Sequence, residues 1–85
     1  MRAVEIYTTP FCPYCHAAKR LLQKKGADYI EVDVSQDPEL RAKMTQRANG
    51  RRTVPQIFIG GKHVGGSDDL HALDHAGKLD PMLAD

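Results

Sequence analysis

The chain has 85 residues, of which 41% are hydrophobic and 27% are charged, a composition typical of one small globular domain. Its 12 basic and 11 acidic residues leave a net charge of +1, which gives no reason to expect a nucleic acid or a membrane surface as partner. No apolar run approaches the roughly 20 residues of a membrane span, and no signal-peptide pattern opens the chain. We therefore expect one domain over residues 1–85 in the reducing cytoplasm, where paired cysteines are more often catalytic than structural.

The first predicted elements are a strand and a helix. Residues 3–7 alternate apolar and polar side chains, which is the period of a strand. Residues 13–25 repeat apolar side chains at helical spacing, with a proline suited to the first helical position and Gly26 suited to end the helix. The basic residues of this helix should face water: Lys19, Arg20, Lys24 and Lys25. They could form a nucleic-acid patch, but a solvated helix face fits the near-neutral charge better.

A second strand and a second helix follow. The apolar side chains of residues 29–34 would share one face of a strand: Ile30, Val32 and Val34. Asp37 is suited to cap a helix over residues 38–48, which Asn49-Gly50 would end. The first strand, first helix and second strand form a βαβ unit, which should be parallel and right-handed.

The second half of the chain predicts a hairpin and a third helix. Residues 56–59 and 62–65 are short strands joined by a two-glycine turn, and with the βαβ unit they complete a four-stranded mixed sheet. Ser67 is suited to cap a helix that Gly77 ends, and Asp80-Pro81 starts a last short turn. The fold class is therefore α/β.

The only two cysteines, Cys12 and Cys15, stand directly after the first strand and at the start of the first helix. The first turn of a helix has unpaired N–H groups and the positive end of the helix dipole, so a sulfur there is favoured as the thiolate. The thiolate is the nucleophile of disulfide exchange, and Cys15 lies one turn further on, close enough to form a small disulfide ring. This spacing predicts that Cys12 attacks and Cys15 resolves.

Two other interpretations of the cysteines compete with redox chemistry. A structural disulfide that closes so short a loop would contribute only about 2 kcal/mol. A zinc site would need further ligands; His16 adjoins the pair, but no second Cys or His pair follows at finger spacing. His71 and His75 lie four positions apart, which can bind a metal, but no Glu follows the first histidine, and surface histidines fit better.

Three motifs in register resemble the signatures of the dithiol glutaredoxins, most closely the small bacterial glutaredoxin 3 type. They are Cys12-Pro13-Tyr14-Cys15, Thr53-Val54-Pro55 and Gly65-Gly66-Ser67-Asp68-Asp69. The similarity runs over essentially the whole chain. It implies a thioredoxin fold with sheet order 2-1-3-4, three main helices, a short C-terminal helical turn, and a cis peptide bond before Pro55, opposite the cysteines.

The resemblance also implies the activity. The chain would be a glutathione-dependent thiol–disulfide oxidoreductase that reduces protein disulfides and protein–glutathione mixed disulfides. Glutathione would be a cosubstrate, and no bound cofactor or metal would be needed. The expected partners are glutathione and disulfide-containing or glutathionylated proteins, with ribonucleotide reductase as one candidate client, and the chain would act as a monomer.

The glutathione contacts that the resemblance implies are Tyr14, Thr53, Val54, Pro55, Gly66, Ser67 and Asp68. The backbone of Val54 would pair with the cysteine of the tripeptide as a neighbouring strand would. The N–H groups of Ser67 and Asp68 would bind the γ-glutamyl carboxylate, and the Asp68 side chain would pair with the amine. Tyr14 could instead be a plain surface or core tyrosine.

One departure from the family concerns the glycyl end of glutathione. The family commonly carries a Lys two or three residues before the first cysteine, where this chain has Thr9 and Pro10. The residues that could replace this lysine are Arg51, Arg52 and Gln56.

Two rival functions remain open on sequence alone. The first is a thioredoxin-like redoxin recharged by a flavoprotein reductase, although thioredoxins usually carry Trp where this chain has Phe11 and Gly-Pro where it has Pro13-Tyr14. The second is an iron–sulfur cluster carrier, a role associated with monothiol relatives that lack a cysteine at position 15 and have glycine at position 13.

Overall fold

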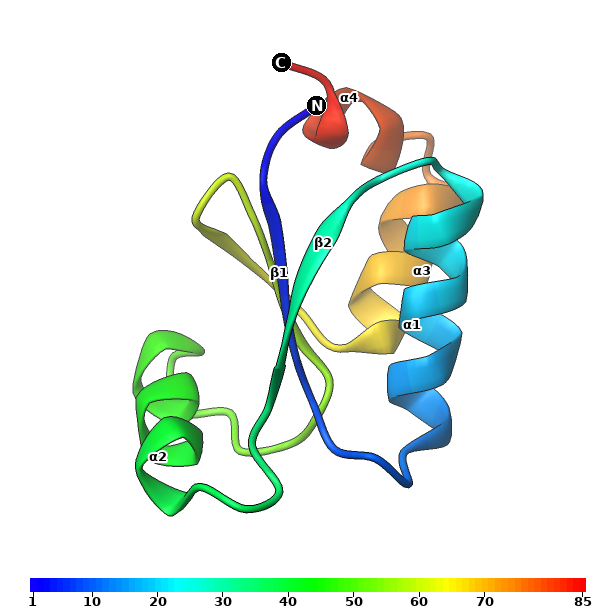
Figure 1. Ribbon diagram of the computed structural model, residues 1–85. Coiled ribbons are helices and arrows are strands. Elements are labelled where there is room, and N and C mark those ends of the chain that lie inside the picture. Colours follow the sequence, from blue (N-terminus) through cyan, green and yellow to red (C-terminus); the bar gives the residue numbers. More distant parts are fainter.

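The computed structural model describes residues 1–85 as one β-sheet with helices on both faces (Figure 1). The elements are β1 (Val4–Thr8), α1 (Pro13–Lys24), β2 (Tyr29–Asp33), α2 (Pro38–Arg47), β3 (Gln56–Ile59), β4 (Lys62–Gly65), α3 (Ser67–His75) and α4 (Leu79–Leu83). The sheet order is β2-β1-β3-β4. Strand β1 is parallel to β2 and antiparallel to β3, which is antiparallel to β4. The predicted thioredoxin fold with its mixed sheet is confirmed.

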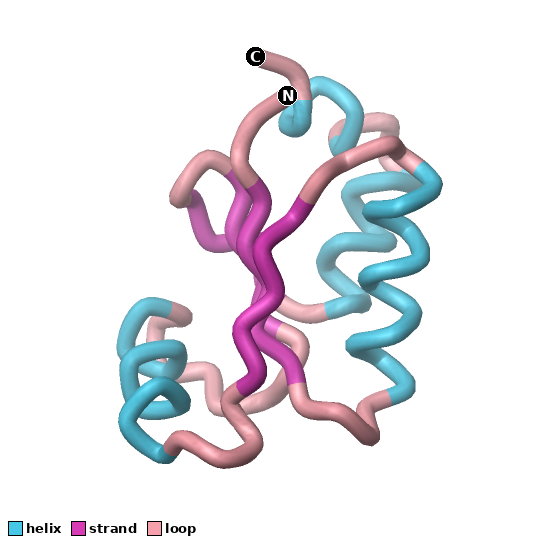
Figure 2. Tube along the Cα trace, viewed as in Figure 1, coloured by secondary structure: helices cyan, strands magenta, loops and turns pink.

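The strands form a central layer, with α1 and α3 on one face and α2 on the other (Figure 2). The main core lies between the sheet and the α1–α3 layer, and the buried residues that form it are Val4, Ile6, Ala18, Leu21, Leu22, Ala27, Ile57, Ile59, Leu70, Leu79 and Leu83. Apart from Ala27, which lies between α1 and β2, they come from alternate positions of β1 and β3 and from the inward faces of the helices, as both periods require. None of the helices has the length and apolar character that crossing a membrane requires.

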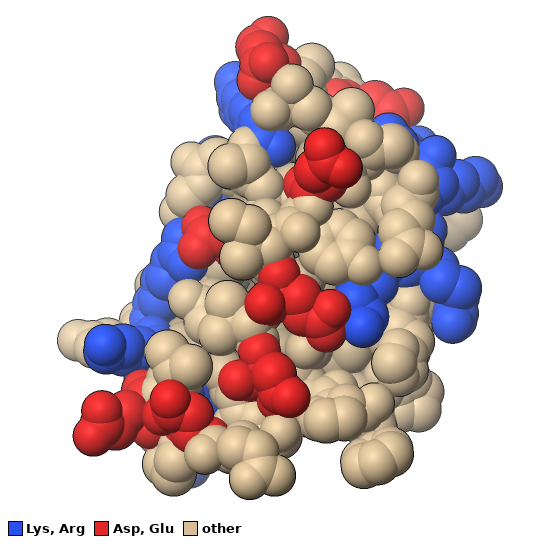
Figure 3. Space-filling view, in the orientation of Figure 1, with Lys and Arg blue, Asp and Glu red and all other residues tan.

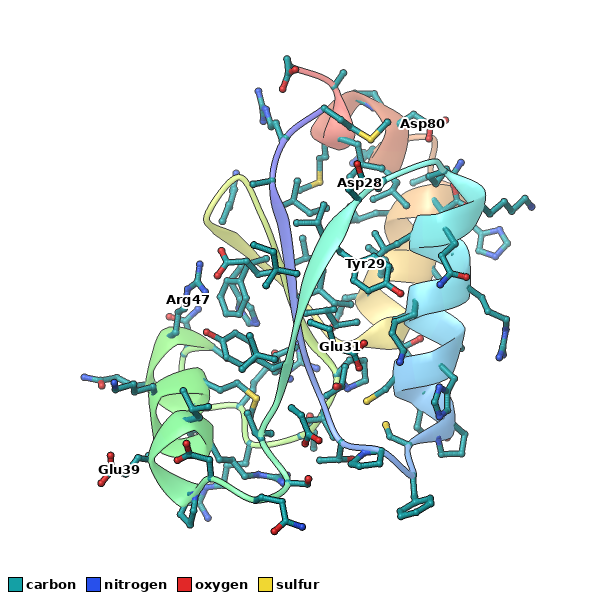
Figure 4. All side chains as sticks on the ribbon, viewed as in Figure 1. Asp28, Tyr29, Glu31, Glu39, Arg47 and Asp80 are labelled. Atoms are coloured by element: carbon teal, nitrogen blue, oxygen red, sulfur yellow. The ribbon has the colours of Figure 1, made fainter.

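The apolar side chains expected to share one face of the edge strand β2 are not all buried. Val34, just after the strand, is 2% exposed, but Ile30 on the same face is 64% exposed. This face looks toward α2, which lies at the end of the sheet away from the start of β2 (Figure 1). Tyr29 and Glu31 are directed toward α1 instead (Figure 4), where the Tyr29 hydroxyl accepts a hydrogen bond from Gln23 at 3.0 Å.

Two of the four basic residues expected to face water, Lys19 of α1 and Lys25 at its C-cap, form ion pairs instead. Lys19 pairs with Glu31 of β2 at 3.1 Å, and Lys25 lies 2.6 Å from Asp74 of α3. Both lysine side chains are about one-fifth exposed, at 18% and 20%. The two ion pairs tie α1 to its neighbours, a role that helical spacing alone does not show.

The predicted start of the third helix is wrong by one residue. Ser67 is the first residue of α3, and Gly66 is its N-cap. The Gly66 N–H donates to the Asp69 carboxylate at 2.9 Å, which is half of a capping box. The Ser67 hydroxyl lies 3.3 Å from the ring of His71, one turn further along α3. Smaller differences are that β1 begins at Val4, α1 ends at Lys24 and α4 begins at Leu79.

Candidate active site

Cys12 stands where β1 passes into α1, and it is the N-cap residue of that helix. Its Sγ accepts a hydrogen bond from the backbone N–H of Cys15 at 3.1 Å. Pro13 occupies the first helical position, where a missing N–H leaves no gap in the hydrogen bonding. An amide N–H and the positive end of a helix dipole both stabilise a negative sulfur relative to a neutral thiol.

Cys15 has a different environment, although it lies only one helical turn away. Its side chain is fully buried, at 0% exposure. Burial raises the pKa of the Cys15 thiol to about 12, the hydrogen bond with Cys12 acts in the same direction, and a backbone hydrogen bond at Thr9 opposes them. The site therefore combines one sulfur at a helix start with one thiol that stays protonated.

The loop before β3 brings a distant part of the chain against Cys12. The Val54–Pro55 peptide is cis, as the resemblance implies. The carbonyl oxygen of Val54 lies 3.8 Å from the Sγ of Cys12, although 42 positions separate the two residues. A backbone segment whose Val54 carbonyl faces the sulfur, and whose Val54 N–H has no partner within the chain, thus lies beside Cys12.

A groove of about 330 Å³ opens beside this contact, within the range of about 300–1,000 Å³ usual for small-molecule sites. It is lined by Tyr14, Arg51, Thr53, Val54, Pro55, Gly66, Ser67 and Asp68. These are all seven of the expected glutathione contacts together with Arg51. Loops and helix starts that are far apart in sequence therefore converge on one groove next to the cysteines.

Arg51 lies at the end of the groove where α3 begins. Its guanidinium donates to the Asp69 carboxylate at 2.8 Å, and the Arg51 hydrogen bond holds the pKa of Asp69 below its usual value, with the Gly66 N–H acting the same way. A Cβ on Gly65 would lie only 2.6 Å from Arg51 Nη1, so this pair needs a glycine there. Because Ser67 and Asp68 also lie at this end, the placement does not support a glycyl contact by Arg51.

The other two expected glycyl contacts do not line the groove. Gln56 is fully buried and hydrogen-bonds to Thr53 and His63. Arg52 is exposed, and its carbonyl accepts a hydrogen bond from Arg41 at 3.0 Å. The expectations that named Gln56 and Arg52 as contacts are therefore not supported, because one side chain is enclosed and the other lies outside the groove.

The remaining surface shows no second site of the kinds considered from sequence. No three His, Cys, Asp or Glu side chains gather to hold a metal, and the Nδ1 of His71 is 2.7 Å from the Ser67 carbonyl of its own helix. In Figure 3, basic side chains on the α1 flank adjoin acidic ones over β2, so both signs occur together on this face.

Comparison with known proteins agrees with this geometry. The glutaredoxin family model matches residues 4–64. A glutaredoxin of Pseudomonas aeruginosa is 58% identical over 99% of this chain and 99% of its own length. Glutaredoxin 3 of Escherichia coli K12 is 53% identical over 98% of this chain and 99% of its own length. The crystal structure of a buckwheat glutaredoxin–glutathione complex is 37% identical, with a TM-score of 0.86, and the match covers 94% of this chain and 74% of that one.

The resemblance drawn from the motifs is thus confirmed over nearly the full length of the chain. Relatives at this level of identity share an oxidoreductase role, and the two thiols supply the groups for thiol–disulfide exchange. The protein is an oxidoreductase enzyme that belongs to the glutaredoxin family.

Proposed function

We propose that the protein is a glutathione-dependent thiol–disulfide oxidoreductase in which Cys12 is the nucleophile and Cys15 the resolving thiol. The observation that carries this proposal is the groove beside Cys12, whose lining offers hydrogen-bonding groups suited to a tripeptide. The similarity to a glutaredoxin solved in complex with glutathione supports it. We further propose that residues 1–85 act as a single monomeric domain in the reducing cytoplasm.

Glutathione fits the groove by the chemistry of its two ends. Its γ-glutamyl carboxylate would accept hydrogen bonds from the N–H groups of Ser67 and Asp68 at the start of α3, where the helix dipole favours an anion. Its amine would pair with the Asp68 carboxylate. Its cysteinyl backbone would pair with Val54 as an added strand, which places the glutathione sulfur next to Cys12.

The glycyl end would be bound more weakly than in relatives that carry the lysine. Thr9 and Pro10 offer no charge there, and Arg51 is engaged with Asp69 at the other end. Tyr14 is 65% exposed on the groove wall and would pack against the bound tripeptide.

Reduction of a glutathione mixed disulfide would need Cys12 alone. Its thiolate attacks the glutathionyl sulfur, a Cys12–glutathione disulfide forms, and the client leaves as a thiolate that takes up a proton. The thiolate of a second glutathione then attacks the bound glutathionyl sulfur. This step releases glutathione disulfide and restores the Cys12 thiolate.

Reduction of a protein disulfide would need both thiols. Cys12 attacks one client sulfur and forms a mixed disulfide, and Cys15 then loses its proton and displaces the client. The resulting Cys12–Cys15 disulfide is reduced by two glutathione molecules, which leave as glutathione disulfide. Glutaredoxin potentials of about −200 to −230 mV lie near that of the glutathione pool, so glutathione can drive the cycle.

The test compares wild type, Cys12→Ser and Cys15→Ser with a glutathionylated peptide and with a protein disulfide, using glutathione and glutathione reductase as the reducing system. We expect Cys12→Ser to lose at least about 1,000-fold in kcat/KM on both substrates. Cys15→Ser should keep turnover of the glutathionylated peptide and lose turnover of the protein disulfide.

Equal losses in both variants on the glutathionylated peptide would contradict the assigned roles. Replacing the glutathione system with a flavoprotein thioredoxin reductase gives a second control. Wild-type turnover with that reductase alone would favour the redoxin alternative over glutathione dependence.

A further inference from the structure

A chain of polar side chains runs from β4 to the loop that precedes the cis proline. The ring Nε2 of His63 on β4 lies 2.7 Å from the Oε1 of Gln56 on β3. The Nε2 of Gln56 donates to the Thr53 carbonyl at 3.0 Å and reaches the Thr53 hydroxyl at 3.3 Å. Gln56 is fully buried, so both ends of its amide depend on these partners.

The donors and acceptors available fix the direction of each hydrogen bond between His63, Gln56 and Thr53. A carbonyl only accepts, so the amide nitrogen of Gln56 must face Thr53 and its oxygen must face His63. Nε2 of His63 therefore carries the proton. Nδ1 is left as an acceptor, and the side-chain amide nitrogen of Asn49 lies 3.4 Å from it.

The surroundings of His63 favour its neutral ring. Burial lowers the pKa of His63, the charges of Arg51 and Arg47 lower it further, and Asp69 acts in the opposite direction. The ring also lies against Phe58, with centroids 5.0 Å apart. A neutral ring with hydrogen on Nε2 is the state that the hydrogen bonds require.

The Gln56 contact orients the peptide between Thr53 and Val54. This peptide is trans, because the Val54–Pro55 bond is the only cis bond in the chain. In a planar trans peptide the C=O and the N–H point in opposite directions. Holding the Thr53 carbonyl against buried Gln56 therefore turns the Val54 N–H away from the interior, and no acceptor within the chain uses that N–H.

We propose that His63 is a positioning residue for substrate recognition, acting through Gln56 to hold the Val54 N–H toward the groove, where it donates to the cysteinyl carbonyl of glutathione. This role rests on the proposed function for its ligand, but the polar chain itself does not. Neither His63 nor Gln56 lines the groove, whereas Thr53 and Val54 both do.

The test compares His63→Leu with His63→Gln. Leucine removes the donor and leaves a buried Gln56 oxygen without a partner, whereas glutamine can place an amide N–H where Nε2 lies. We expect His63→Leu to raise KM for a glutathionylated peptide by about tenfold, the effect of one lost hydrogen bond, with kcat unchanged within about twofold. His63→Gln should restore KM to within about threefold of wild type.

Two further measurements separate positioning from general damage. The rate at which iodoacetamide alkylates Cys12 should be the same in all three proteins, because it does not use the Val54 N–H. Nitrogen-15 NMR of wild-type protein should show His63 with hydrogen on Nε2, a readout that does not depend on whether His63→Leu folds.

The proposal is overturned if folded His63→Leu keeps the wild-type KM, if its kcat and alkylation rate both fall, or if NMR finds hydrogen on Nδ1. Failure of the proposed function looks different. In that case wild type would show no saturation with the glutathionylated peptide, while the NMR assignment would still test the polar chain.

Discussion

The sulfur of Cys12 accepts the amide hydrogen of Cys15, whereas the Cys15 side chain has no exposed surface. Two of the causes that raise the pKa of Cys15 come from Cys12 itself, its hydrogen bond and its charge, and both are lost once Cys12 is bound in a mixed disulfide. Burial, the largest cause, remains. Cys15 thus becomes easier to ionise at the stage when it has to attack, which suits a resolving thiol.

The raised pKa of Cys15 also predicts how stability depends on pH. In the unfolded chain this thiol ionises near the ordinary cysteine pKa of 9.0, and in the folded chain at about 12. Between these values the unfolded state binds fewer protons than the folded state, so the free energy of unfolding falls as pH rises. Reduced wild type should therefore lose more stability between about pH 8 and about pH 10.5 than Cys15→Ser.

Urea unfolding in the presence of a phosphine reductant measures this difference. The comparison uses only the change in the free energy of unfolding between the two pH values, because the substitution itself alters stability at every pH. Parallel losses in the two proteins would show that Cys15 ionises in the folded state as easily as in the unfolded state.

At the residue scale, the sequence could predict the site residues that lie in short motifs, but not those whose place depends on contacts between strands. The cysteine pair, the cis proline loop and the start of α3 are short motifs, and the seven groove residues matched to them do converge. The burial of Gln56 could not be predicted, because a polar residue at the start of a strand gives no sign of which face it uses. Its partner His63 lies opposite Phe58 in the β3–β4 ladder, next to a shift in register between Ile57 and Phe58 that the sequence does not reveal.

Among the elements, α2 is a helix held by little apolar burial. Met44 is its only fully buried residue. At its C-terminal end, Arg47 is directed at the sheet (Figure 4), and its guanidinium donates to both carboxylate oxygens of Glu5 at 2.7 and 2.8 Å. The guanidinium also lies 3.9 Å from the centroid of the Phe58 ring. Polar and cation–π contacts thus replace the broad apolar face of a typical packed helix.

The contacts of Arg47 lead to a second pH-dependent prediction. Arg47→Met should lower the free energy of unfolding by about 1–2 kcal/mol at neutral pH, through loss of a paired hydrogen bond and a cation–π contact. The Arg47 hydrogen bond holds the pKa of Glu5 below its usual value. The contribution of the pair is therefore present above the unfolded-state pKa of 4.5 and is lost as pH falls through the lower folded-state value.

Urea unfolding at about pH 7 and about pH 3 checks this prediction. Arg20→Met on α1 is the matched control, since Arg20 is exposed and forms no ion pair, and we expect almost no change there. An Arg47→Met loss of the same size at both pH values would mean that packing of the side chain, not the Glu5 pair, is what matters.

Over the whole molecule, the order of strands and helices could be predicted because each element carries its own periodicity. The role of α4 could not, since five residues give too short a pattern to show what they cover. In the structure α4 lies at the same end as both chain termini, and the loop that carries Cys12 lies at the other (Figure 1). Leu79 and Leu83 of α4 complete the main core, and the Leu83 carbonyl accepts the Arg2 N–H at 2.8 Å.

Because α4 lies far from the Cys12 loop, a change in α4 should lower stability without changing activity. Leu83→Ala tests this. Removing a side chain that is 2% exposed should cost about 2–5 kcal/mol. Because a small domain has only about 5–15 kcal/mol in total, Tm should fall by at least about 10 °C. The fraction that stays folded at 25 °C should nevertheless keep the wild-type KM for a glutathionylated peptide, since α4 contributes nothing to the groove.

Lys78→Ala, an exposed neighbour, should change neither Tm nor KM. A raised KM in Leu83→Ala would show that the far end of the core does control the groove.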